Sequence, residues 1–386
     1  KNNRILRSQQ VLKALIAIIR PYVPLDLQNT RITAEDIIAV LGYASVHRIS
    51  IDAASHELKE APSANRLREV LAQALPDRAT LQRALNTILR MQTPRFIKKG
   101  KRAYYMAIDL TLIPYHGEHY ADEKEIIRSQ PKSGTTHFHG YASVSIVHDN
   151  QRFVVALRFV EKGESMQEIV AWLFDRLKSI GISIKRAYLD KGFCSVPVLK
   201  TLQRRKIKFI MPMPVRRKSG GVRKLFEASA SYKTTYIFNS PKHGELKVSA
   251  VAVKKYSKGR YHRKGTRWFA YAVAGLPKAV EPHQVFELYR QRFGIETSYR
   301  QMNQVRARTT SRNPVIRLLL VGLAFILFNL YIANRQHFAI CLKNPTKPFS
   351  KFWLTLRRLA RMLAQAVENL FDLADVVSRH THVTLS

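Results

Sequence analysis

The sequence predicts an α/β protein with a mixed sheet at its centre, an all-helical domain before it and a helical region after it. Hydrophobic residues recur with helical spacing through residues 1–95. From about residue 102, three successive segments are rich in β-branched and aromatic residues, and strand-like and helix-like segments then alternate. This order is typical of a meander of strands that continues into a parallel sheet.

The N-terminal domain, residues 1–95, is predicted to bind DNA. Thr33 and Asp36 indicate a helix start and Gly42 a helix stop, and two short helices over 49–58 and 64–75 follow. The second of them carries exposed Arg66 and Arg68, which is typical of a helix-turn-helix that contacts DNA. A generic helical bundle explains the same pattern, and both interpretations stay open. A further helix is predicted over 77–91.

The first part of the sheet core is predicted over residues 102–214. Its strands are expected at 104–113, 137–147 and 152–160, with a hairpin turn at Asp149-Asn150 between the last two. Ser165 and Glu168 form a capping box that begins a helix, and Gly181 ends it. The rest is predicted as a strand over 185–190, a helix over 196–205 and a strand over 208–213.

Residues 215–278 are predicted as a β-rich insertion, since they combine Gly, Lys, Arg and Ser with short strand-like segments. Residues 279–340 would complete the core with a helix bearing Glu296 and a buried helix, and 341–386 would form a helical C-terminal region. The apolar run 315–333 is nearly long enough to span a bilayer. We expect a helix buried against a sheet instead, because Arg317 and Asn329 interrupt the run in an otherwise polar, basic chain.

Composition narrows the function classes. The 386 residues include 65 Lys and Arg against 27 Asp and Glu, which gives a formal net charge of +38. This surplus predicts nucleic acid or an anionic surface as partner, and its dispersal along the chain favours a long DNA duplex. The chain is too polar and basic for a membrane protein. A hydrophobic content of 46% excludes global disorder. Two cysteines give no disulfide framework or structural zinc motif, and no secretory segment follows the N-terminus, so we expect a cytoplasmic protein.

Three acids stand out from this basic background. Asp109 interrupts an apolar strand, where a charge is costly unless it binds a metal or a cation. Asp190 follows the strand AYL, at the edge where open α/β sheets bind ligands. If their strands are neighbours, these acids meet, and a later helix would bring Glu296 to them. The alternative for Asp109 is a buried acid satisfied by Arg or by backbone N–H groups.

Glu296 lies in the segment YRQRFGIETSYRQMN, residues 289–303. At about 100° per residue, Tyr289, Arg292, Glu296 and Asn303 fall within roughly 80° of one helical face. An ordinary Arg–Glu pair on a surface helix explains part of this pattern, but not the Tyr and Asn. Three convergent carboxylates would hold two Mg²⁺ ions about 3.5–4 Å apart, and Tyr289, Arg292 and Arg300 would then bind phosphates of DNA.

These residues resemble the insertion-sequence transposases of the DDE type that carry a Tyr-x2-Arg-x3-Glu-x6-Lys signature. Tyr289, Arg292 and Glu296 match its spacing, and Asn303 replaces the final Lys. The segments AIDLTLIPYHG and YLDKGF, the 215–278 insertion and the apolar helix after Glu296 also resemble that family, over about 102–335. Because of Asn303, we expect Arg300 or Arg306 to supply the missing charge.

The resemblance implies a ribonuclease-H-like core and an Asp109, Asp190 and Glu296 triad that serves both as catalyst and as ligand of two Mg²⁺ ions, which Mn²⁺ would replace. It implies an endonuclease that cleaves at terminal inverted repeats and joins 3′-hydroxyl ends to target DNA. The expected partners are these DNA segments and a second copy in a homodimer. The expected setting is the nucleoid of a bacterial or archaeal cell.

Other interpretations stay open. The chain would be a DNA-binding relative that has lost its chemistry, as Asn303 hints, or a ribonuclease-H-like nuclease without end-specific binding. His116, His119, His137 and His139 suggest a metal site, but no cysteine accompanies them. One of the last two would lie near Asp109 if 137–147 is its neighbouring strand. The Tyr- and Lys-rich segment 254–268 would track DNA, or Trp268 would pack on a strand.

Overall fold

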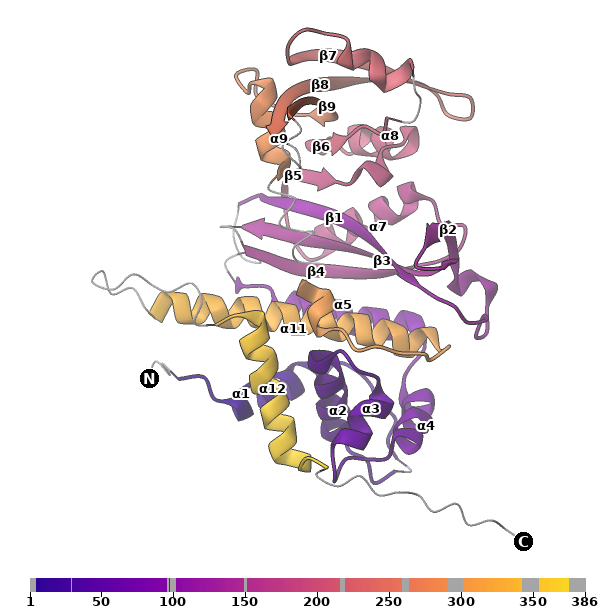
Figure 1. The fold of residues 1–386 in the computed structure, drawn as a ribbon, viewed down its shortest axis with the longest axis vertical. Coiled ribbons are helices and arrows are strands. Elements are labelled where there is room, and N and C mark those ends of the chain that lie inside the picture. Colours follow the sequence, from indigo (N-terminus) through magenta and orange to yellow (C-terminus); the bar gives the residue numbers. More distant parts are fainter. Residues whose placement is uncertain are drawn as a thin grey trace. The chain divides into compact units, whose positions relative to one another are not determined.

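The computed structural model describes most of the chain and divides it into two compact units, one of residues 1–88 and 301–386 and one of residues 89–300. The described ranges are 5–28, 30–95, 97, 102–148, 151–215, 219–258, 264–290, 301–341 and 354–374. The predicted α/β class and the helical N-terminal region are confirmed (Figure 1).

The unit of residues 1–88 and 301–386, called the helical unit below, contains helices from both ends of the chain. Helix α5 begins in this unit, and its last residues belong to the other one. Its elements are α1 (Ser8–Ile19), α2 (Ala34–His47), α3 (Ile51–Glu57), α4 (Ala64–Ala74), α5 (Arg78–Gln92), the 3-10 turn η5 (Asn303–Val305), α11 (Pro314–Cys341) and α12 (Leu356–Phe371). Segments far apart in sequence therefore share one core, in which α12 packs on α1 and α2.

Helix α2 begins as predicted and ends later than predicted. The Asp36 N–H donates to Thr33 Oγ1 at 3.1 Å, and the Asp36 carboxylate accepts from the Thr33 N–H at 2.9 Å. The predicted stop at Gly42 is wrong, because the helix continues to His47 and ends at Arg48 with φ of 61°. A Cβ on Gly42 would lie 3.2 Å from Leu15 Cδ2. The glycine therefore serves close packing of α2 on α1 instead of termination.

Helix α11 contains the long apolar run and is buried inside the helical unit. By length and composition it could cross a membrane, but 94% of its apolar window is buried. The prediction of a buried helix is thus confirmed, and within the helical unit the partners of α11 include α2, α12 and η5. A Cβ on Gly322 would meet the side chain of Leu85 at 2.6 Å, so α11 approaches α5 closely.

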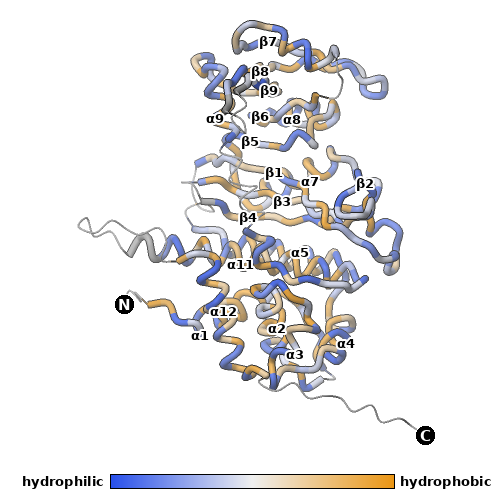
Figure 2. Tube along the Cα trace, in the orientation of Figure 1, coloured by the Kyte–Doolittle hydropathy of each residue, from blue (hydrophilic) through white to orange (hydrophobic). Residues whose placement is uncertain are grey.

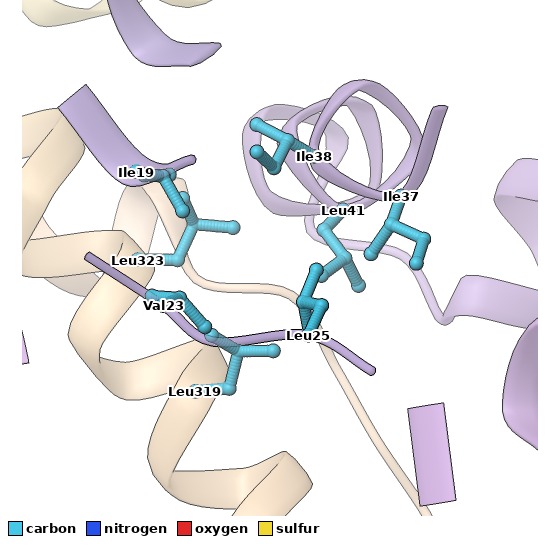
Figure 3. Close-up of a pocket in the computed structure, with 8 residues that line it drawn as sticks. All are labelled: Ile19, Val23, Leu25, Ile37, Ile38, Leu41, Leu319 and Leu323. Atoms are coloured by element: carbon cyan, nitrogen blue, oxygen red, sulfur yellow. The ribbon is translucent and has the colours of Figure 1, made fainter. Parts of the chain in front are cut away.

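A small apolar cavity marks where α1, α2 and α11 meet (Figure 3). Its volume is about 20 Å³, close to the space of one water molecule. Its walls are the apolar side chains of Ile19, Val23, Leu25, Ile37, Ile38, Leu41, Leu319 and Leu323. With no polar group to bind water, the cavity is a packing defect of the core and offers no ligand site.

The unit of residues 89–300, called the sheet unit below, is built on one nine-stranded sheet with the order β2-β3-β1-β5-β6-β9-β8-β7, in which β4 also pairs with β3. The strands are β1 (Tyr104–Pro114), β2 (Ile127–Lys132), β3 (Thr135–His148), β4 (Gln151–Val160), β5 (Ile184–Leu189), β6 (Phe209–Pro212), β7 (Tyr232–Ser240), β8 (Gly244–Lys258) and β9 (Lys264–Ala274). In Figure 2, hydrophobic residues predominate along the central strands.

Strand directions follow from the connections. Strands β1, β3 and β4 pair antiparallel, and β5 and β6 run parallel to β1. The parallel pairs need crossovers, which α7 (Met166–Ser179) and α8 (Val196–Arg204) provide. The segment predicted as an insertion extends the same sheet, because β9 pairs antiparallel with β6. The predicted turn at residues 149–150 lies outside the described residues.

Helices cover the sheet. Helix α7 begins at the predicted capping box, in which the Ser165 N–H donates to Glu168 Oε2 at 2.7 Å, and Gly181, with φ of 75°, follows its end. It packs on β3 and β4. Helix α9 (Pro282–Arg290) packs on β6 and β8 through a cluster that includes Val285, Tyr271 and Tyr188. This cluster fixes α9 on the part of the sheet next to β5.

Candidate active site

The register of β1 and β5 brings Asp109 and Asp190 together. The two strands are parallel, and Ile108 is the partner of Leu189. The next residue on one strand is Asp109 and on the other Asp190. Neighbouring strands lie about 4.8 Å apart, so the two acids lie side by side, Asp109 within β1 and Asp190 at the carboxyl end of β5. Both side chains are half-buried.

Local structure explains how each acid is held. Residues 106–108 are buried, and the Asp109 carboxylate then accepts a hydrogen bond from the Leu110 N–H at 3.0 Å. Asp190 precedes the 3-10 turn η2 (Lys191–Phe193), and its carbonyl accepts from the Phe193 N–H at 3.0 Å. A Cβ on Gly192 would lie 3.8 Å from Asp190 Oδ2, an ordinary van der Waals distance, so Gly192 lies next to the carboxylate without being required by it.

Tyr289 ties the end of α9 to this place. Its hydroxyl donates to the carbonyl of Leu189 at 3.3 Å, directly before Asp190, and the side chain is only 4% exposed. Its ring lies 5.3 Å from that of Tyr271, and burial raises the pKa of the Tyr271 phenol. Sequence analysis predicted a phosphate contact for Tyr289. The structure gives it a buried contact with the sheet, so its role is to position α9.

The other residues of the Glu296 motif are not all within the described chain. Arg292, Glu296 and Arg300 lie outside the described residues, and Asn303 is an exposed residue at the start of η5 in the helical unit. Within the described ranges, no group of three His, Cys, Asp or Glu side chains could hold a metal. Asp109 and Asp190 therefore form a pair to which a third ligand would have to come from elsewhere.

The predicted DNA contacts of α4 have local partners. Arg66 lies 3.4 Å from the carboxylate of Glu69. Arg68 donates to Asn65 Oδ1 and lies 3.5 Å from the carboxylate of Asp52. These exposed pairs contribute little stability, but they reduce the positive charge that α4 presents.

The sequence predicts a histidine near Asp109, but His139 lies too far along the sheet to contact this acid. His139 pairs with Ile113, four residues beyond Asp109, which corresponds to about 13 Å along a strand. The imidazole is 1% exposed and lies 4.7 Å from the ring of Tyr115, with Phe159 also nearby. His139 is thus part of an aromatic cluster in the core, and this placement needed the strand register, which the sequence pattern does not supply.

The fold and the acid pair define an α/β protein with an acidic site where the carboxyl end of β5 lies beside the middle of the parallel strand β1. A family model described as "Transposase DDE domain" matches residues 101–330. The chain belongs to this family of DDE transposases, and the predicted resemblance is confirmed at that level.

A solved structure supports the fold. The piggyBac transposase in a synaptic complex with hairpin DNA is similar with a TM-score of 0.57 and 13% identity, over 96% of this chain and 81% of that one. A Drosophila P element transposase strand transfer complex matches 52% of this chain and 43% of its own at 13% identity and a TM-score of 0.22, too low to support an argument. No curated protein matches the sequence.

Proposed function

We propose that this protein is a DNA transposase that cleaves at the ends of its element and transfers the resulting 3′-hydroxyl ends into target DNA. The observation that carries this proposal is the parallel register that sets Asp109 beside Asp190. The family match supports the class of enzyme. The strong positive charge supports DNA as the substrate.

The sheet supports a ribonuclease-H-like assignment of the core. Five of its strands lie in the order β4-β3-β1-β5-β6, with β3 antiparallel to β1 and with β5 and β6 parallel to it. Asp109 lies within β1 and Asp190 follows β5. We assign the two acids to the first two positions of the triad on this basis.

Glu296 is assigned to the third position. Tyr289 is bonded to the residue before Asp190, and Glu296 follows it by seven residues. Seven residues span at most about 25 Å even when fully extended, so a segment that starts at Tyr289, beside Leu189, can bring Glu296 to both acids. Arg292 and Arg300 are proposed to bind phosphates near the reacting bond, since guanidinium groups match phosphate geometry.

The donor set fits Mg²⁺. Asp109 and Asp190 offer hard carboxylate oxygens, which Mg²⁺ prefers, and both are half-buried, so solvent also reaches them. When bound to these two acids and Glu296, two ions would supply Lewis-acid activation and stabilise charge at the phosphate. The chain's own part is to fix the carboxylates through the β1–β5 register and to hold α9 through Tyr289.

The proposal is tested by Asp109→Asn, Asp190→Asn and Glu296→Gln in the full chain. The substrate is a duplex from the DNA that flanks the reading frame, where we expect terminal inverted repeats. Each variant should lose Mg²⁺-dependent cleavage and strand transfer and keep binding to the duplex, because each loses one oxygen ligand and no phosphate contact. Wild-type cleavage in any variant would refute its assignment, and a wild-type protein without cleavage or binding would refute the proposed function.

The proposal also names two binding partners, the DNA ends of the element and a second copy of the chain. We assign residues 1–95 to binding of the element ends. We also propose a homodimer that holds two ends together. Mass measurement of the protein with and without the terminal duplex tests this, and a monomer on paired ends would contradict it.

A further inference from the structure

Helix α12 carries its charges in an unusual arrangement. Arg357, Arg358 and Arg361 are exposed in its first two turns, and Glu368 lies near its end. The N-terminus of a helix carries partial positive charge and the C-terminus partial negative charge. Cations at the start and an acid at the end are therefore both placed against the helix dipole. Stability alone does not favour this arrangement.

The arginines share one face, and the opposite face is in the core. At about 100° per residue, positions 357, 358, 361 and 365 fall within roughly 100° of the helix circumference. All four side chains are exposed. The buried side of the helix consists of Leu356, Leu359, Leu363, Ala364, Val367 and other apolar residues. The packing thus fixes the direction in which the arginines point.

The start of α12 is capped, and its middle is hydrogen-bonded to α1. Thr355 Oγ1 accepts a hydrogen bond from the Arg358 N–H at 3.1 Å and caps the helix. Ser8 of α1 donates to Gln365 Oε1 at 2.8 Å, which joins the middle of α12 to the beginning of α1. The arginines therefore project from a fixed helix surface, which lowers the entropy lost on binding.

The surrounding chain offers few acids that could neutralise them. Residues 297–367 contain twelve Lys and Arg and no Asp or Glu. Arg357 and Arg361 form no ion pair with any residue that the structure describes. This differs from α4, where Arg66 and Arg68 lie near Glu69 and Asp52.

We infer that the exposed face of α12, formed by Arg357, Arg358, Arg361 and Gln365 and called the α12 face below, binds the phosphate backbone of duplex DNA. This inference rests on the proposed function, and it places a DNA contact on a helix that follows the family-matched residues in sequence. Arg357 and Arg361 are one helical turn apart, about 6 Å, so they can contact separate phosphates. Such contacts give affinity and orientation and do not read sequence.

The test compares two double variants of the full chain with equal loss of charge. Arg357→Gln with Arg361→Gln removes the α12 face, and Lys178→Gln with Arg204→Gln removes two exposed cations from α7 and α8. Binding to a random-sequence 30-base-pair duplex is measured between 50 and 300 mM salt. For the α12 variant, the slope of log K against log salt should fall by about 2, at roughly 0.9 per phosphate contact.

The possible results distinguish a failure of the α12 inference from a failure of the proposed function. The control variant should keep the wild-type slope, and the α12 variant should lose affinity by a similar factor on the terminal duplex and on unrelated duplexes. Its melting temperature should equal or exceed that of the wild type, because cations at a helix start are unfavourable. An unchanged slope, or an equal fall in the control, would overturn the inference and leave the Asp109–Asp190 proposal intact. A wild-type protein that binds no duplex would refute both.

Discussion

The sheet unit and the α12 face of the helical unit treat their charges differently. In the sheet unit, many cations have an acidic partner close by: Arg158 pairs with Glu164, Arg205 with Asp175 and Lys255 with Glu287. In the helical unit, Arg66 and Arg68 also lie near acids, whereas Arg357 and Arg361 of the α12 face form no ion pair with any residue that the structure describes. The comparison teaches that net charge alone does not locate a DNA contact. The local balance of charges does.

The largest expected effect concerns the chemistry of the sheet unit. Asp190→Asn should lower cleavage by about 10³-fold or more, because a lost metal ligand removes several kcal/mol of transition-state stabilisation. Its salt slope of DNA binding should stay at the wild-type value. Single-turnover cleavage of the terminal duplex measures the first and fluorescence anisotropy the second. If Asp190→Asn weakened binding more than the α12 double variant does, the proposed division of roles would be wrong.

The next effect concerns packing in the helical unit. Gly322→Val should destabilise it by about 1–3 kcal/mol, because the added side chain enters the space of Leu85, whose atoms lie 2.6 Å from the site of a Cβ. Denaturant unfolding measures the change. A second substitution, Leu85→Ala, should recover part of the loss by making room. Strict additivity of the two destabilisations would show that the two residues do not compete for space.

A smaller effect is expected from the start of α7 in the sheet unit. Ser165→Ala should cost about 0.5–2 kcal/mol, because it removes the side-chain acceptor of the Glu168 N–H. Ser165→Thr keeps the acceptor and serves as the control. Hydrogen exchange should rise in peptides from α7 and stay unchanged in α1 and α2. Equal rises in both units would mean that they unfold together.

The smallest effect is a pH dependence. Hydrogen bonds from Arg205 at 2.6 and 3.0 Å lower the pKa of Asp175 below its ordinary value of 3.8. A carboxylate with a lowered folded-state pKa stabilises the fold above the unfolded pKa and loses this effect as the pH falls through the folded value. Asp175→Asn should therefore cost a few tenths of a kcal/mol at pH 7, because the pair is exposed. At a pH below the folded-state value the difference should vanish, and a constant difference from pH 7 to pH 2 would contradict it.

Local chemistry explains which features the sequence could predict. The expected strand at 104–113 agrees closely with β1 (Tyr104–Pro114), because β-branched and aromatic residues cluster there. The capping box at Ser165 is equally local. The proximity of Asp109 and Asp190 could also be predicted from local signals. Asp109 lies within an apolar strand and Asp190 directly follows one, and α/β sheets place such apolar strands at their centre.

Long-range pairing explains what the sequence could not predict. Nothing in residues 264–274 says that β9 pairs with β6 and extends the main sheet. Gly42 has the composition of a helix stop, and only its contact with Leu15 shows that it serves packing. Tyr289 has the spacing of a phosphate ligand, and only its burial shows the bond to Leu189. The placement of α11 among helices likewise depended on partners more than 200 residues away in sequence, such as α2.

The central claim is that the carboxylates of Asp109, Asp190 and Glu296 share bound divalent ions. Electron paramagnetic resonance of Mn²⁺ titrated into the full-length protein tests it most directly, because it counts bound ions without any DNA. The wild type should bind Mn²⁺, and Asp109→Asn, Asp190→Asn and Glu296→Gln should each weaken that binding by at least tenfold, with Glu287→Gln as an unaffected control. Wild-type binding by Glu296→Gln would contradict the claim.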